Sequence, residues 1–345
     1  MTMTFPAKAG AAIDKASRAG LTMIASSAQA RPCISFVVPC HDEEGTIEET
    51  ITTVAAEARR LGRSFEIIVV DDGSRDRTVE RARALMDAHP VLILRLSRNF
   101  GKEQAITAGL KAARGDATVI LDADLQEPIS YLGTLLSHWE EGYEMVYAVR
   151  GHRDDEPRLK RSAARMFYWF LDRSTSVPIP PNARDFRLMD RKVVDALVAL
   201  PERGRFMKGL YGWVGFRSKE IVIELEPRRS GTSKFGARRL AALALTGFTS
   251  FSDWPLRVWS GIGLCVAGLS ILFGAWIVFK TLLWGADTPG WATLSVGIFF
   301  LGGIQLISIG VLGEYVGRIF EEVKGRPGHI VAEVIDYRDP KSRSS

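Results

Sequence analysis

Two short carboxylate-rich segments contain the side chains best suited to binding a charged ligand. One holds Asp71 and Asp72, and the other holds Asp122 and Asp124. Each follows a run of apolar, mostly β-branched residues, so each is predicted to lie at the end of a buried parallel strand, where open α/β sheets place their ligand sites. Two aspartates separated by one residue can share a divalent cation, and Mg²⁺ bound in this way also takes oxygens from substrate phosphates. The pattern suits a nucleoside diphosphate whose leaving charge needs a metal.

The residues around these segments alternate between strand and helix patterns. This alternation predicts an α/β fold with right-handed crossovers and a doubly wound, mostly parallel sheet. A dinucleotide-binding domain would need G-x-G-x-x-G after its first strand, but the sequence there is Val38-Pro39-Cys40-His41-Asp42-Glu43-Glu44, which disfavours NAD or FAD. The expected strands are 34–39, 66–70, 91–96, 118–121 and 145–149, and the expected helices are 46–61, 78–88, 102–113 and 128–141.

Composition narrows the class of protein further. The chain has 345 residues, of which 46% are hydrophobic, and its formal net charge is +5. The charge fits a membrane surface or an anionic substrate better than nucleic acid, because no compact basic run with interleaved aromatics occurs. Cys33, Cys40 and Cys265 show no C-x-x-C spacing. A disulfide framework is therefore not expected, and the soluble part is predicted to lie in a reducing compartment.

Two long apolar stretches follow the α/β region, at about 258–283, with no charge until Lys280, and at about 291–313, with none. Each is long enough to cross a bilayer, for which roughly 20 residues are needed, and aromatic residues stand at the ends. We expect a transmembrane helical hairpin, with two buried core helices as the alternative. Basic residues flank the outer ends of the pair, so the positive-inside rule predicts a multi-pass protein of the inner or plasma membrane with the α/β domain and both termini in the cytoplasm.

The whole chain then divides into five regions. Residues 1–31 are expected to be a flexible tail and not a targeting segment, because charged residues interrupt any apolar core. The catalytic domain is predicted over 32–235 and the membrane hairpin over 257–317. Between them, 236–256 is an interfacial amphipathic helix or, equally well, a plain core helix. The final region, 318–345, is cytoplasmic, and its strand-like part at 326–336 could pair with a neighbouring subunit.

Several motifs occur together in one order along the chain. They are Val38–Glu44, Val70–Thr78, Ser97–Lys102, Asp122–Pro128, Asp185–Met189, Arg229–Phe235 and Gly313–Arg318. With the membrane hairpin, they resemble the family 2 glycosyltransferases of GT-A fold. More narrowly, the chain resembles the polyprenyl-phosphate glycosyltransferases, such as dolichol-phosphate mannose synthase and the bacterial undecaprenyl-phosphate sugar transferases. One departure is Cys40-His41, where the family usually has an apolar or small residue followed by Tyr and Asn.

The resemblance implies roles on the donor side of the site. A divalent ion, Mg²⁺ or Mn²⁺, would be held by Asp122, Asp124 and Gln126, which would then count as catalytic. A helix-capping loop is the alternative for the two aspartates. Asp72 would read the nucleobase, with Asp71 and Glu44 near base and ribose, although Asp71 also suits a turn before Gly73. The implied nucleotide-sugar-binding residues are Pro39, Glu44, Asp71, Asp72, Lys102 and Asp122.

The acceptor side needs cations and no general base, because a polyprenyl phosphate is already anionic near neutral pH. Bidentate arginine suits a phosphate head group. A surface charge is the alternative for each candidate taken singly. Arg150, at a strand end, is also implied as catalytic. The candidates for contacting the acceptor phosphate or the donor pyrophosphate are Arg150, Arg153, Arg165, Arg229, Ser233 and Lys234.

The resulting hypothesis is an inverting glycosyltransferase that moves a sugar from a nucleotide sugar, UDP-linked in preference to GDP-linked, to polyprenyl (undecaprenyl) phosphate at the cytoplasmic membrane face. The resemblance also implies a homo-oligomer, with a tetramer as one form. A processive polysaccharide synthase is one alternative, but its Gln-x-x-Arg-Trp element is absent. A catalytically silent membrane scaffold that binds nucleotide sugar is another, and intact Asp122, Asp124 and Gln126 argue against it.

Overall fold

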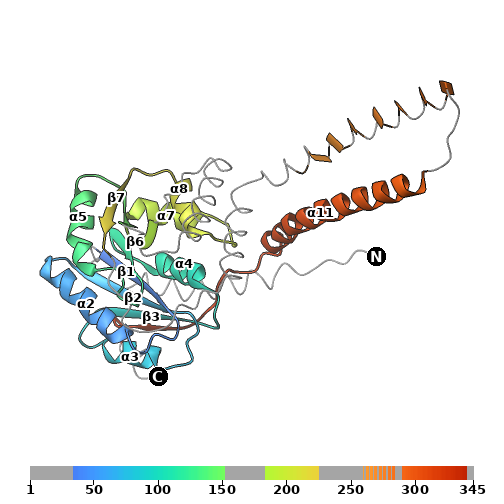
Figure 1. Ribbon diagram of the computed structural model, residues 1–345. Helices are drawn as coiled ribbons and strands as arrows, with labels where there is room; N and C mark the ends of the chain where they lie inside the picture. Colours follow the sequence, from blue (N-terminus) through green and yellow to red (C-terminus); the bar gives the residue numbers. More distant parts are fainter. Residues whose placement is uncertain are drawn as a thin grey trace.

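The computed structural model describes residues 34–151, 183–224 and 290–339, together with scattered positions between 259 and 283. The expected tail at 1–31 and the segment 236–256 lie outside the described residues. One mixed sheet organises the domain, in the order β7-β5-β6-β4-β1-β2-β3-β8 (Figure 1). Its strands are β1 (Ile34–Cys40), β2 (Phe65–Asp71), β3 (Val91–Leu96), β4 (Ala117–Ile120), β5 (Met145–Arg150), β6 (Ala183–Asp190), β7 (Ser218–Ile223) and β8 (Val331–Asp336).

The centre of the sheet is parallel, and antiparallel strands are added on both sides. β4, β1, β2 and β3 run parallel to one another, as β5 does to β7. β6 is antiparallel to both β4 and β5, and β8 is antiparallel to β3. The α/β fold with a mostly parallel sheet is confirmed. The central strands are apolar along nearly their whole length because helices cover both faces of the sheet.

Helices form a layer on each face of the sheet (Figure 1). α2 (Ile47–Arg60), α3 (Thr78–Ala84) and α5 (Leu132–Glu140) pack into one hydrophobic core, and α4 (Lys102–Ala112), α7 (Arg191–Ala199) and α8 (Met207–Trp213) pack into the other. α3 ends at Ala84, before the expected end at 88, and residues 85–88 form a turn. Pro90 follows closely, and a proline disfavours the helical conformation in the residue before it. The expected helix at 128–141 begins with a short 3₁₀ turn, η1 (Ile129–Tyr131), after the extended Pro128.

A long helix, α11 (Trp291–Val323), projects from the domain (Figure 1). It has 33 residues and runs ten residues beyond the expected end at 313, stopping near Gly325, whose φ is +72°. Within the described residues, the stretch Phe300–Val323 is the one helix long and apolar enough to cross a membrane. The described positions between 259 and 283 are helical, but the first expected span is not described continuously, so the two-helix hairpin stays a prediction.

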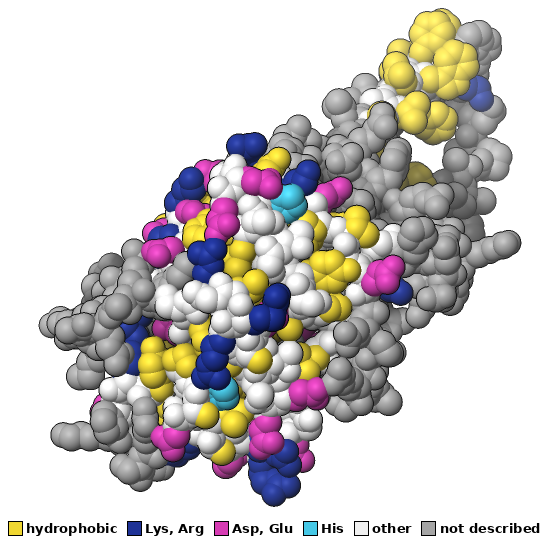
Figure 2. Space-filling view, turned by 90° about the vertical axis from the view of Figure 1, so that its left-hand side faces the viewer, with side chains coloured by type: hydrophobic (Ala, Val, Ile, Leu, Met, Phe, Trp, Pro, Cys, Tyr) yellow, Lys and Arg dark blue, Asp and Glu magenta, His cyan; other side chains and the backbone are white. Residues whose placement is uncertain are grey.

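The distribution of side chains differs between the domain and its projection. Figure 2 shows charged side chains of both signs interspersed over the described face of the domain, with hydrophobic side chains gathered at the tip of the projection. Trp276, Phe279, Leu306 and Phe320 are each more than half exposed. Large apolar side chains in such numbers on a surface mark a site of interaction with a membrane or another protein.

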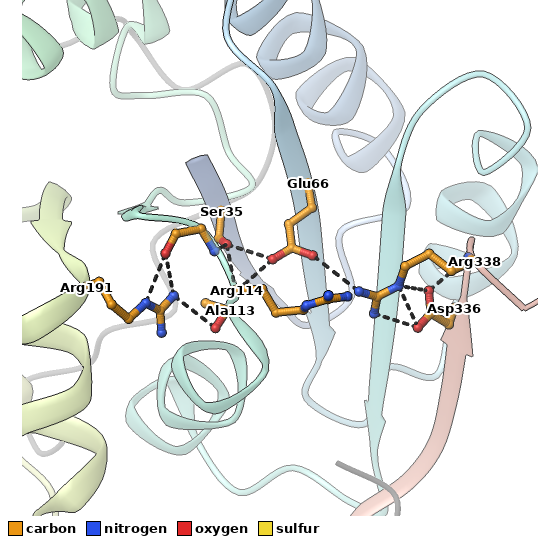
Figure 3. Close-up of polar contacts among 8 residues, drawn as sticks. Ser35, Glu66, Ala113, Arg114, Arg191, Asp336 and Arg338 are labelled. Carbon is orange, nitrogen blue, oxygen red and sulfur yellow. Dashed lines mark hydrogen bonds and ion pairs between the residues drawn. The ribbon is translucent and has the colours of Figure 1, made fainter. Parts of the chain in front are cut away.

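A buried polar network attaches the C-terminal strand to the sheet, at the end of β2 opposite Asp71 (Figure 3). Glu66 in β2 accepts hydrogen bonds from the Ser35 hydroxyl at 2.7 Å and from the Arg114 backbone N–H at 2.9 Å. Its second oxygen faces the Arg338 guanidinium at 4.0 Å, and Arg338 also donates to Asp336. A strand was expected over 326–336, with a neighbouring subunit as one partner. In the structure, β8 pairs with β3 of its own chain.

The turn after β2 depends on a glycine that nothing larger can replace. At Gly73, φ is +72°, and a Cβ would lie 2.6 Å from the Arg98 carbonyl carbon and 2.7 Å from the Asn99 nitrogen. At Gly62, φ is +65° and the space is open. Both alanine variants adopt a left-handed backbone that costs about 1–2 kcal/mol, but only G73A also displaces backbone. We expect G73A to lower the thermal midpoint in detergent well beyond G62A; equal shifts would contradict this account.

Candidate active site

A lysine shared by two carboxylates forms the centre of the site. α4 begins at Lys102, whose Nζ lies 2.5 Å from Oδ1 of Asp122 and 2.5 Å from Oδ2 of Asp185. Asp122 follows β4, and Asp185 lies in the adjacent antiparallel strand β6. Desolvation disfavours the ammonium, but the two carboxylates outweigh it and raise the pKa of Lys102 well above its ordinary value. The side chain is 42% exposed, so this cation remains accessible to a ligand.

Asp185 is ionised by its surroundings. Burial alone would raise the pKa of this carboxyl, but Lys102 and Lys208 together hold it well below its usual range. Lys208 in α8 donates to the Ala183 carbonyl at 3.1 Å, which fixes its ammonium near the start of β6. Arg187, further along β6, stacks 3.5 Å from the Tyr211 ring centroid. The site therefore holds a fixed carboxylate among several fixed cations.

The sequence placed Asp185 in a recognisable motif without giving it a role, and it gave none to Lys208. A signal was present in β6, where charged Arg184, Asp185 and Arg187 interrupt a strand that is otherwise largely apolar. Three charged residues within four positions of a strand in the sheet, next to the strand that leads to Asp122, are costly unless they are paired. Lys102 supplies the partner for Asp185.

The loop after Asp122 adds further oxygen atoms. Asp124 Oδ1 accepts a hydrogen bond from the Gln126 backbone N–H at 3.2 Å, and the intervening Leu125 has φ +54°. Glu127 is buried, and its Oε1 accepts from Arg184 Nε at 2.9 Å. Burial and the nearby Asp122 raise the pKa of Glu127 to about 7 against the opposing effect of Arg184. The second oxygen of Glu127 is buried without a hydrogen-bond partner.

The expected metal ligands fit a hard divalent ion, although they do not form a complete cage. In the described part of the chain, no group of three or more His, Cys, Asp and Glu residues is close enough to hold a metal. Asp122, Asp124 and Gln126 can offer carboxylate and amide oxygens, and Mg²⁺ commonly takes one or two carboxylates plus substrate phosphates. The buried Glu127 oxygen that lacks a hydrogen bond marks further unused acceptor capacity close by.

The aspartates after β2 are both engaged within the protein. Asp72 accepts from the backbone N–H groups of Phe100 at 2.7 Å and Gly101 at 2.9 Å, with one oxygen each. Burial raises the pKa of Asp72, and these two hydrogen bonds oppose the rise. Asp71 is fully buried and accepts from the Ser74 N–H at 3.0 Å. Asp72 therefore shapes the loop that leads into Lys102, a structural role that the sequence did not indicate.

A cavity of about 740 Å³ adjoins this loop. Asp122 and Lys102 do not line this cavity, which lies beside residues of β3 and β8. Its lining carries three arginines against two carboxylates, Asp42 and Glu333, so its formal charge is only slightly positive. Glu44 and Pro39, expected near the nucleotide, do not line it; Glu44 accepts from the Arg77 N–H at 3.1 Å, and Pro39 is buried in β1. The lining residues are His41, Asp42, Gly73, Ser74, Arg75, Arg95, Leu96, Ser97, Arg98, Asn99, Ala332 and Glu333.

Of the expected acceptor-side residues, the structure describes one. Arg150 ends β5 and is partly buried, where it joins the same sheet as Asp122 and Asp185. The others, Arg153, Arg165, Arg229, Ser233 and Lys234, lie outside the described residues. The structure thus brings Lys102 and Asp122 together, and it adds Asp185, Lys208 and Glu127 to them.

Comparison with known proteins identifies the family to which the chain belongs. Residues 35–198 match the model of glycosyl transferase family 2. A prophage-derived bactoprenol glucosyl transferase of Shigella flexneri is 46% identical over 299 residues, which cover 86% of this chain and 97% of that protein. The chain belongs to glycosyltransferase family 2. A prophage bactoprenol glucosyl transferase homologue of Escherichia coli is 43% identical over 302 residues, covering 87% and 99% of the two chains.

Two further comparisons complete the picture of this family 2 glycosyltransferase. An uncharacterised glycosyltransferase of Synechocystis is 45% identical over 305 residues, covering 87% of this chain and 95% of that one. Among solved structures, glucosyl-3-phosphoglycerate synthase of Mycobacterium tuberculosis matches with a TM-score of 0.42 and 20% identity, over 66% of this chain and 80% of that one. This structural likeness adds nothing to the family assignment.

Glu103 next to the lysine gives the site a measurable pH dependence. Burial and Asp185 raise its pKa from 4.5 to about 7, while its hydrogen bond from the Met207 N–H opposes the rise. Between these two pH values the folded chain binds more protons than the unfolded chain, so this group makes stability fall as pH rises, by at most ~1.4 kcal/mol per pH unit. We expect the thermal midpoint of E103Q, minus that of wild type, to increase as the pH is raised from 5 to 7.5. A difference that stays constant across this range would contradict the assignment.

Proposed function

We propose that this chain transfers a sugar from a nucleotide sugar to a polyprenyl phosphate at the cytoplasmic face of a membrane. The observation that carries the proposal is identity of 43–46%, over 86–87% of this chain, to proteins named bactoprenol glucosyl transferase or its homologue. Because those relatives are glucosyl transferases by name, glucose is the first sugar to test. UDP is the first nucleotide to test, as the family resemblance implies.

On the donor side, Asp122, Asp124 and Gln126 would hold Mg²⁺ or Mn²⁺. The bound ion would supply charge stabilisation to the departing diphosphate. Lys102 would orient the Asp122 carboxylate through their 2.5 Å contact, and it would place a second positive charge beside the leaving group. The cavity beside the Asp72 loop is large enough for the nucleoside, with Arg75, Arg95 and Arg98 in its wall.

On the acceptor side, the phosphate needs charge neutralisation and alignment. Arg150 and Lys208 are proposed to supply it, together with Arg153, Arg165, Arg229, Ser233 and Lys234. The acceptor oxygen is already anionic, so it can attack the anomeric carbon without losing a proton to the protein. Attack in line with the departing diphosphate inverts the anomeric configuration. The fixed negative charge of Asp185 would hold the surrounding cations in place.

The same proposal includes the setting of the enzyme. We propose a protein of the inner or plasma membrane with two spans, of which α11 is the second, and with both termini in the cytoplasm. A homo-oligomer, such as a tetramer, belongs to the proposal as well. Labelling of single cysteines from each side of sealed vesicles tests the topology, and mass measurement in nanodiscs tests the oligomer.

The central test uses purified protein in vesicles that contain undecaprenyl phosphate, with Mg²⁺ or Mn²⁺ and a panel of radiolabelled UDP- and GDP-sugars. We expect label from one donor to enter the organic phase. D124N, or a chelator, should reduce the rate roughly 100-fold or more, because the developing diphosphate charge loses its stabilisation. D195N is the matched control, since Asp195 is exposed on α7.

Each part of the proposal can fail separately in this assay. Full transfer by D124N, or in the presence of chelator, would contradict the metal site and leave the reaction in place. Label that enters a polymer would point to a processive synthase. If the protein binds nucleotide but transfers sugar from no donor, the proposed transferase activity would be contradicted and a catalytically silent scaffold favoured.

A further inference from the structure

Three consecutive residues at the start of α4 contact three different parts of the molecule. Lys102 lies between the site carboxylates. Glu103 accepts the Met207 N–H at 3.1 Å and so holds the start of α8. Gln104 donates from Nε2 to the carbonyl oxygen of Arg203 at 2.7 Å. The position of the active-site lysine is thereby tied to a surface turn at residues 203 and 204.

The membrane-directed helix holds the same turn from its other side. Glu322, in the last turn of α11, accepts hydrogen bonds at one oxygen from the N–H of Arg203 at 3.0 Å and of Gly204 at 3.1 Å. The Arg203 guanidinium donates to the carbonyl of Arg326 at 3.1 Å, just beyond the end of the helix. Glu322, Arg203 and Gln104 therefore form a continuous chain of hydrogen bonds, which we call the α11–α4 link.

Close packing supports this link. Gly328 lies so near Gln104 that a Cβ on the glycine would be 2.2 Å from the Gln104 side-chain oxygen. His329 Nδ1 lies 3.5 Å from the same oxygen. Burial lowers the pKa of His329 to about 4, so the ring is neutral at physiological pH and adds no charge to this contact. After His329, the Ile330 carbonyl accepts a hydrogen bond from the Ser97 N–H at 2.9 Å, and the chain then enters β8.

The link joins two parts of the molecule that meet different phases. α11 exposes large apolar side chains such as Leu306 and Ile309, whereas the Lys102 cluster belongs to a water-facing domain. An acceptor with a long apolar tail is held by the bilayer at a fixed depth, so its phosphate can approach from a restricted range of positions. Reaction then requires that the cluster sit at a matching height above the helix, and misplacement by about 1 Å can cost up to 100-fold in rate.

We propose that Glu322 and Gln104 are positioning residues that set the height and orientation of the Lys102 cluster relative to α11. The inference rests on the proposed function, because it concerns transfer to an acceptor anchored in the bilayer. Breaking the link leaves Lys102, Asp122 and Asp185 in contact with one another. Donor binding and reaction with a water-soluble acceptor should therefore survive its loss, while reaction with the embedded acceptor should not.

The experiment compares two acceptors in one enzyme preparation. Undecaprenyl phosphate in vesicles is the embedded acceptor, and a short-chain, water-soluble prenyl phosphate is the free one. We expect E322A to lower kcat/KM for the embedded acceptor about tenfold, as the loss of two hydrogen bonds to one carboxylate allows. The kcat/KM for the free acceptor and the KM for the donor should stay within about twofold.

Two matched variants separate the link from charge and from folding. E322Q keeps an oxygen that can accept both N–H groups, so it should restore most of the activity. E321A removes the adjacent exposed carboxylate and should behave as wild type. Q104A, which breaks the other end of the link, should show the same acceptor-selective loss as E322A. Thermal midpoints in detergent confirm that each variant is folded.

The outcomes are distinct. An equal loss on both acceptors, or an E322Q variant as impaired as E322A, would overturn the link while the proposed function stands. Wild-type activity with E322A at every acceptor would do the same. No transfer by the wild-type chain to either acceptor would overturn the proposed function, and the link with it.

Discussion

The Lys102 ammonium, shared between Asp122 and Asp185, is the contact on which the rest of the site depends. The two carboxylates stand at the ends of neighbouring strands, and without a cation between them they would repel each other in a partly desolvated space. The lysine reaches them only because α4 begins at that residue. The start of α4 is fixed in turn by Asp72, which accepts the backbone N–H groups of the preceding loop. One ion pair thus links the first half of the sheet to the strand that arrives from the second half.

The acidic residues of the domain have different roles in this arrangement. Asp71 and Asp72 are buried and bonded to backbone, so they act as internal supports for the loops they join. Asp122 is more open, with a side chain 24% exposed, and contacts Lys102 through Oδ1. Glu127 and Glu103 lie at the edge of the same cluster with pKa values near neutrality. A site of this kind can take up and release positive charge, including that of a metal or of an arginine, without rebuilding its framework.

The local part of this design was predictable from the sequence, and the long-range part was not. Apolar strands followed by Asp122 and Asp124 predict carboxylates at a sheet edge, and the structure confirms the strands before them. Asp185 could not be paired with Asp122 in the same way, because β6 reaches β4 from about sixty residues further along the chain, and no local pattern gives the register. The backbone hydrogen bonds of Asp72 could not be predicted, because they join it to residues of another loop, and its expected contact with the nucleobase stays a prediction. Hydropathy located the apolar part of α11, but a helix continues through polar residues as long as no breaker stops it, so the end at Val323 was missed.

The order of elements along the chain has a consequence for how the domain is made. β8 is the last strand in sequence, and it covers the edge of β3, with Arg338 bound to the buried Glu66. During synthesis on the ribosome, strands β1 to β7 emerge before α11, and β8 emerges after it. The edge of β3 that β8 covers is thus open until the apolar helix has been made. An exposed edge strand is prone to pair with other chains, so the nascent chain carries an unprotected strand edge until β8 has followed α11, and the sheet is completed only after the apolar helix has been made.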